Sequence, residues 1–123
     1  MGYYTYHQLR IHQVDDEEIN NNKDLRHKLE DEINEAIQNN EDMEYAVGSI
    51  TEEYYNDSCK WYEHREDMIE FSKKFPNVVF ELEGSGENSG DLWKEYYKDG
   101  SYQYCPAILT YEEYSSDKLK KIK

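Results

Sequence analysis

The first recognisable element is a β-strand over residues 3–14, where polar and hydrophobic positions alternate. Leu9 and Ile11 alternate with Arg10 and His12, and the tyrosines before them favour the same extended conformation. A period of two places Leu9 and Ile11 on one side of the strand and their neighbours on the other. We therefore expect this segment to be the first strand of a sheet.

A helical spacing replaces this alternation over residues 23–38. The acidic run at 15–18 and the asparagines at 20–22 come just before it, and residues of these types cap the starts of helices. A helix is expected here, and its apolar face consists of Leu25, Leu29, Ile33, Ala36 and Ile37.

The middle of the chain leaves alternatives open. Residues 39–42 have the composition of a loop, whereas residues 45–50 fit either a short strand or the end of a second helix. After them, the pattern predicts a short strand over residues 58–62 and a helix over residues 63–75, which Pro76 ends.

Three further strands follow. Residues 78–83 alternate as a strand, and residues 84–90 form a glycine-rich loop. Strands over 91–98 and 101–111 are joined at Asp99-Gly100, a strong hairpin signal.

This order of elements predicts an α+β fold. We expect a mainly antiparallel sheet of four to five strands with two helices packed on one face. A single domain is expected over residues 1–114, followed by a frayed basic tail at 115–123 that carries four lysines.

Composition changes this picture in one respect. Leu, Ile, Val and Phe together account for only 22 of the 123 residues, and the net charge is -14. That pairing is typical of disordered chains. Thirteen tyrosines and two tryptophans argue against disorder, because each such ring can bury roughly 150–250 Å² while its polar edge stays in water. A folded domain rich in aromatic contacts is therefore expected.

The charge points to a class of partner. Residues 1–57 contain 15 acidic and 4 basic residues, so this half repels phosphate groups. Direct binding to nucleic acid or to an anionic membrane is not expected, and a basic protein is the natural partner. The sequence contains neither a long apolar run nor a basic stretch leading into one at its start, so we expect a cytosolic protein. In a reducing cytosol Cys59 and Cys105 are expected to be buried thiols.

No motif predicts catalysis, a metal or a cofactor. The glycines at 84, 86 and 90 miss the dinucleotide-binding spacing, and the carboxylates around them fit no calcium loop. The histidines and cysteines lack zinc-site spacing, and His7 and His12 fall on opposite sides of one strand. We expect structural histidines and no enzymatic activity.

Partner-binding residues are predicted in two acidic segments. The outer face of the helix at 23–38 has few basic neighbours four residues away, and the second segment mixes carboxylates with aromatic rings that suit Arg- and Lys-lined grooves. The predicted residues are Glu30, Asp31, Glu32 and Glu35 in the first segment, and Glu52, Glu53, Tyr54, Tyr55 and Asp57 in the second.

Residues 58–111 also resemble a known group of sequences. The similarity lies in the runs WYEH (61–64), DM (67–68), FSKKFPNV (71–78), FEL (80–82), GSGE (84–87) and SGDLW (89–93). Together they resemble a family of small, uncharacterised bacteriophage and prophage proteins, and the strand–helix–strand order is similar to ferredoxin-like domains of phage genomes. The resemblance implies an origin in a phage or mobile element, and it carries no catalytic residues.

These observations lead to one leading hypothesis. Small acidic phage proteins often inhibit host defence, and an array of carboxylates can occupy the basic channel in which a nuclease holds DNA or guide RNA. We therefore expect an inhibitor of a nucleic-acid-targeting defence protein, such as an anti-CRISPR protein.

Two alternatives remain. One is a phage housekeeping or regulatory domain that binds another protein or a small ligand at its sheet. The other is a metal-dependent hydrolase that uses the carboxylates of the glycine-rich loop. A homodimer formed through tyrosine-rich strand edges is a further expectation.

Overall fold

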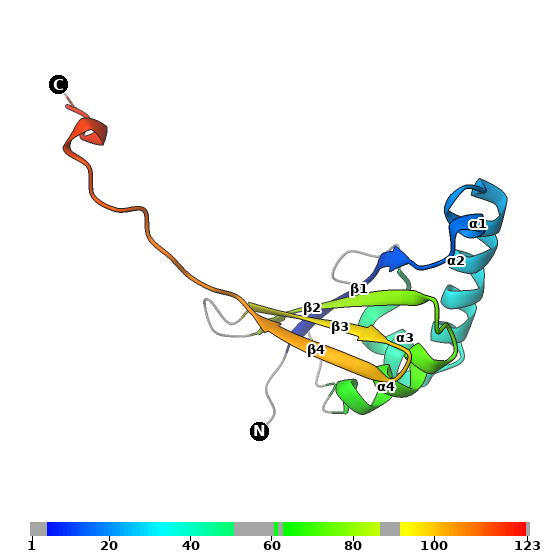
Figure 1. Ribbon diagram of the computed structural model, residues 1–123. Helices are drawn as coiled ribbons and strands as arrows, with labels where there is room; N and C mark the ends of the chain where they lie inside the picture. Colours follow the sequence, from blue (N-terminus) through cyan, green and yellow to red (C-terminus); the bar gives the residue numbers. More distant parts are fainter. Residues whose placement is uncertain (1–4, 51–60, 62, 87–91, 123) are drawn as a thin grey trace.

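The computed structural model describes residues 5–50, 61, 63–86 and 92–122. Its centre is a four-stranded antiparallel sheet in which the strands follow one another in sequence order (Figure 1). The strands are β1 (Thr5–Val14), β2 (Val78–Gly86), β3 (Leu92–Lys98) and β4 (Ser101–Pro106).

The described residues between β1 and β2 form four helices, and a short 3₁₀ turn follows the sheet. The predicted α+β class with an antiparallel sheet is therefore confirmed. The helices are α1 (Glu17–Asn20), α2 (Lys23–Gln38), α3 (Glu41–Val47) and α4 (His64–Lys73), and the turn is η1 (Ser116–Lys118).

Side-chain caps fix the starts of the first three helices. Asp16 accepts a hydrogen bond from the Glu18 amide at 3.0 Å, and Asn22 accepts one from the Asp24 amide at 3.0 Å. Asn40 does the same for the amide of Met43 at 3.2 Å. Each cap satisfies amides that have no partner within their own helix, which is why the acidic and asparagine runs divide this part of the chain into three helices.

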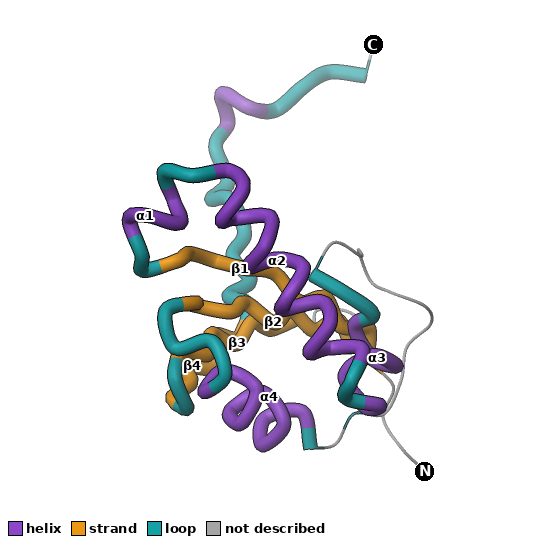
Figure 2. Tube along the Cα trace, turned by 90° about the vertical axis from the view of Figure 1, so that its right-hand side faces the viewer, coloured by secondary structure: helices purple, strands orange, loops and turns teal. Residues whose placement is uncertain are grey.

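One face of the sheet carries the hydrophobic core. Leu9, Phe80 and Leu82 are fully buried and belong to one cluster with Ile33 of α2 and Phe71 of α4. Helices α2, α3 and α4 lie on the same side of the sheet (Figure 2). The period of two turns every second side chain of the strands to the opposite face, which we call the helix-free face because the described helices α2, α3 and α4 lie on the other side.

The helix predicted at 23–38 matches α2, and of the open segment 45–50 the first three residues form the end of helix α3. The loop predicted at 39–42 is wrong for Glu41 and Asp42, because the Asn40 cap starts α3 there. The helix predicted at 63–75 corresponds to α4. Of the short strand predicted at 58–62, only Trp61 lies within the described residues, and it is not in a strand.

The glycine-rich loop predicted at 84–90 is wrong in its first part. Strand β2 continues to Gly86, and Gly84 pairs with His7 on one side and Trp93 on the other. A Cβ atom at Gly84 would lie 2.1 Å from the indole of Trp93. Glycine is needed at this position because the ring packs directly on the backbone.

The last predicted strand is shorter than expected. The hairpin turn is confirmed, with φ angles of 44° at Asp99 and 85° at Gly100. Strand β4 nevertheless ends at Pro106 rather than at residue 111, because its partner β3 begins at Leu92. The Ala107 amide makes the last bond of this pairing, to the Leu92 carbonyl oxygen at 3.0 Å.

Candidate functional site

Helices α1 to α3 form a strongly acidic surface. Residues 17–47 contain ten carboxylates and three lysines and arginines. We call the exposed carboxylates in the second half of α2 and in α3 the acidic helical surface: Asp31, Glu32, Glu35, Glu41, Asp42 and Glu44.

Three predicted residues lie together on α2. Asp31, Glu32 and Glu35 are exposed, while Ile33 and Ile37 of the same helix are buried in the core. In the described part of the chain no lysine or arginine forms an ion pair with these three carboxylates. Their carboxylates therefore face solvent without a lysine or arginine partner among the described residues.

Glu30 differs from the other three. It is half-buried and accepts a hydrogen bond from Arg26 Nε at 3.2 Å, one helical turn away. Arg26 is one of the few basic neighbours on this face, and the i,i+4 spacing brings it to Glu30.

The second predicted segment, residues 52–57, lies outside the described part of the chain. Its carboxylates and rings lie outside the described residues: Glu52, Glu53, Tyr54, Tyr55 and Asp57. The structure therefore brings together only the α2 residues of the predicted site.

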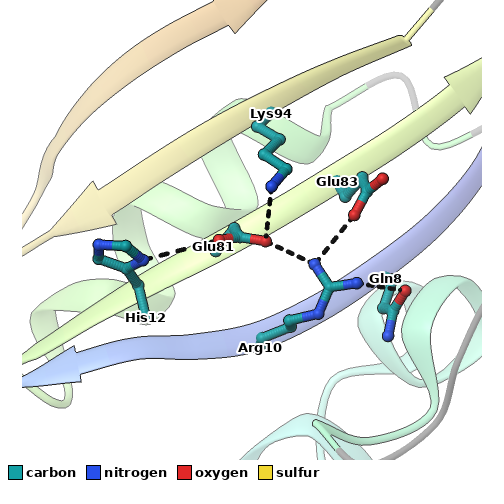
Figure 3. A network of polar contacts seen from close by, with 6 residues as sticks. All are labelled: Gln8, Arg10, His12, Glu81, Glu83 and Lys94. Carbon is teal, nitrogen blue, oxygen red and sulfur yellow. Dashed lines mark hydrogen bonds and ion pairs between the residues drawn. The ribbon is translucent and has the colours of Figure 1, made fainter.

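The helix-free face of the sheet carries a network of charged side chains (Figure 3). Arg10 on β1 donates to Glu81 at 2.5 Å and to Glu83 at 2.9 Å, both on β2. It also donates to Gln8 at 2.8 Å. From the other side, Lys94 of β3 lies 3.5 Å from Glu81.

Two properties of this network follow from its geometry. Only 9 % of the Glu81 side chain is exposed. Its charge is compensated because two cations, Arg10 and Lys94, lie beside it. Partial burial works to lower the pKa of Arg10, but its bonds to Glu83 and Glu81 outweigh that effect and raise it. The network joins three strands and did not emerge from the sequence reasoning. The sequence feature that could have revealed it is the alternation along the strands, which places Arg10, Glu81 and Lys94 on the same face of the sheet.

A second polar group lies inside the core, on the helix-covered face. Glu95 of β3 is fully buried and accepts hydrogen bonds from His64 Nε2 at 2.9 Å, Tyr97 Oη at 2.6 Å and Arg65 Nη2 at 2.5 Å. Burial alone would raise the pKa of Glu95, but the bonds from His64, Tyr97 and Arg65 outweigh it and lower the pKa to about 2. Burial and the bond to Glu95 raise the pKa of Tyr97. The carboxylate is thus held ionised inside the protein.

Two histidines and two indoles surround this carboxylate. His64 stacks on Trp93 with ring centroids 5.2 Å apart, and buried His7 meets Trp61 edge-on at 5.4 Å. The Trp61 indole donates to Asp67 at 2.7 Å. Burial, followed by the charge of His64, lowers the pKa of His7 to about 4. His7 is therefore a neutral core side chain at neutral pH.

The placement of the histidines follows the predicted alternation. His7 faces the helices, whereas exposed His12 lies on the opposite face, 3.6 Å from Glu81. Among the described residues no three His, Cys, Asp or Glu side chains are placed to hold a metal ion. Cys105 is a half-buried free thiol rather than a fully buried one, because β4 is an edge strand, and Cys59 lies outside the described residues.

None of the described helices combines the length and apolar character that a membrane crossing requires. Comparison of the chain with protein-family models, curated proteins and solved structures gives no match. The function is therefore argued from the chain's own surfaces and charges.

Proposed function

We propose that this protein is a non-enzymatic inhibitor that binds a basic host protein through its acidic helical surface. The partner class is a nucleic-acid-targeting defence protein, such as a CRISPR nuclease complex, in the cytosol of a bacterial host. The carboxylates would take the place of nucleic-acid phosphates in the positively charged channel of that enzyme.

The observation that carries this proposal is the exposure of Asp31, Glu32 and Glu35 without ion-pair partners among the described residues. Elsewhere in the described chain, buried carboxylates such as Glu81 and Glu95 are matched by cations. Uncompensated like charges on one helix face repel one another and weaken the fold. A basic partner removes that repulsion on binding.

Origin in a phage or mobile element is part of the proposal. It rests on the sequence resemblance described above for residues 58–111, to which the comparisons with known proteins add no match. The order β1, helices, β2, β3 also agrees with the first part of the β-α-β-β-α-β ferredoxin-like pattern, and we propose that the fold is a variant of it.

The test is inhibition of purified RNA-guided nucleases of several types, measured as DNA cleavage against added protein. The matched variants each replace three carboxylates by lysine. One is Asp31→Lys/Glu32→Lys/Glu35→Lys on α2, and the control is Glu112→Lys/Glu113→Lys/Asp117→Lys in the C-terminal segment. Both change the net charge equally, so only location differs.

We expect the α2 variant to lose inhibition by at least about tenfold and the control to retain it, because close charge pairs at interfaces contribute strongly to binding. Inhibition should also weaken as salt rises, through screening. Inhibition that survives both the α2 reversal and moderate salt would contradict charge mimicry.

A second candidate is a phage housekeeping domain that binds another protein or a small ligand at its sheet. It is favoured by the helix-free face, which presents Arg10 and Lys94 at side-chain exposures of 37 % and 45 %. Such a domain would leave every host nuclease in the panel unaffected.

A further inference from the structure

The chain beyond β4 forms an extended arm that leaves the rest of the protein. We define the C-terminal arm as residues 107–122; in Figure 1 it runs away from the sheet and the helices. Four of its aliphatic side chains are largely exposed: Ile108 at 86 %, Leu109 at 76 %, Leu119 at 66 % and Ile122 at 102 %.

The described contacts of the arm are local. Ala107 bonds to Leu92 where the arm begins, and Lys118 forms an ion pair with Glu112 inside the arm. Aliphatic surface left in water carries a free-energy cost that grows with its area. Exposed aliphatic residues in a segment whose described contacts are local are available to bind an apolar surface.

An apolar groove lies at the opposite end of the sheet. It is lined by the end of β1, by helices α1 and α2, and by the connection from α4 to β2. Its volume of about 170 Å³ is below the roughly 300–1,000 Å³ of small-molecule pockets, so it suits one or two side chains. The apolar lining consists of Val14, Ile19, Leu29, Phe75, Pro76 and Val78.

The surroundings of the groove and the end of the C-terminal arm carry opposite charges. Exposed Glu17 and Glu18 stand on α1 beside groove residue Ile19, and Asp16 caps that helix. The end of the arm reads KLKKI over residues 118–122, so Leu119 and Ile122 are flanked by lysines. Lys74 also lines the groove. Its single positive charge is outnumbered by the carboxylates of Asp16, Glu17 and Glu18.

We propose that Leu119 and Ile122 of one copy occupy this groove in a second copy of the chain. The arm departs beside Leu92, whereas the groove adjoins Val14 and Val78, at the other end of the antiparallel strands. Each copy supplies one arm and one groove, so reciprocal exchange about a two-fold axis closes a dimer.

The experiment measures the mass of the full-length chain by sedimentation velocity from low to high micromolar concentration. The arm variant is Leu119→Asp/Ile122→Asp, and its matched control is Ile108→Asp/Leu109→Asp, which removes as many aliphatic side chains from the start of the arm. We expect a concentration-dependent dimer for the unmodified protein and the control. The arm variant should raise the dimer dissociation constant by at least about tenfold.

A groove variant, Ile19→Lys, gives a second measurement. It should be monomeric alone, and mixing it with the arm variant should restore part of the dimer, since one intact arm then meets one intact groove. The proposal is overturned if the unmodified protein stays monomeric in the high micromolar range, or if the arm variant dimerises as strongly as the control. This readout needs no nuclease, so it is independent of the proposed inhibitory function.

Discussion

His64 on α4 and Glu95 on β3 stand 31 residues apart in the sequence, and His64 Nε2 lies 2.9 Å from Glu95 Oε1 inside the protein. The neighbouring Arg65 adds a second bond from the same helix to the same carboxylate. Its guanidinium also packs over the ring of Tyr102 on β4, 4.6 Å from the ring centre. His64 and Arg65 therefore attach α4 to β3 through the buried charge of Glu95, and Arg65 also attaches it to β4 through the ring of Tyr102.

Removing that charge should weaken the fold. We expect Glu95→Gln to lower the free energy of unfolding by about 1–3 kcal/mol, because the amide cannot accept all the bonds that the carboxylate accepts. Urea unfolding measures the change. The exposed Glu66→Gln serves as the control and should stay within about 0.5 kcal/mol of the unmodified protein. Equal stabilities of the two variants would show that Glu95 does not anchor the helix.

Acid should destabilise the protein in two steps. The pKa of His7 is about 4 in the folded protein against 6.5 in the unfolded chain, so the unfolded chain binds the extra proton first. The stability that neutral His7 contributes is complete above pH 6.5 and is lost as pH falls towards 4. Glu95 acts in the same direction lower down, between its unfolded pKa near 4.5 and about 2.

His7→Gln isolates the first step. The variant should lose less stability than the unmodified protein between pH 7 and pH 4.5, with a difference of about 2 kcal/mol. Urea unfolding at several pH values gives the slopes. His12→Gln on the exposed face of the same strand is the control and should keep the steeper slope. Parallel slopes for all three proteins would contradict the assignment to His7.

Gly84 should not tolerate a side chain. The methyl group of Gly84→Ala would overlap the indole of Trp93, so the ring or the strand must shift. We expect a loss of about 1–3 kcal/mol and a change in tryptophan fluorescence. Ser85→Ala, one residue along the same strand, removes only a hydroxyl group and should leave both nearly unchanged. An alanine variant as stable as this control would mean that Trp93 does not pack on the Gly84 backbone.

The charged network on the open face should contribute modestly. Arg10→Met removes two ion pairs and a bond to Gln8, and leaves Glu81 with Lys94 alone among its lysine and arginine partners in the described residues. A loss of about 1–2 kcal/mol is expected, since Arg10 is partly exposed. Lys94→Met removes one longer pair and should cost less. Thermal unfolding in low salt compares them, and the reverse order would overturn Arg10 as the centre of the network.

Local patterns predicted much of the fold. The alternation around Leu9 placed β1, the helical spacing of Ile33 and Ile37 placed α2, and Asp99-Gly100 placed the last turn. These features depend on residues a few positions apart, so the sequence displays them directly. The limits of β2 and β4 were missed because they depend on a partner strand: Gly84 continues the sheet only because His7 and Trp93 flank it.

The sequence by itself determined the class of the fold, the start of helix α2 and the excess of acidic charge in the first half. Tertiary structure alone decided which carboxylates form ion pairs and which face solvent. Asp31 and Glu95 are chemically similar, yet one faces water and the other lies buried among His64, Arg65 and Tyr97. The reason is physical: burial and ion pairing depend on distances between side chains that are remote in sequence, and no local period records those distances.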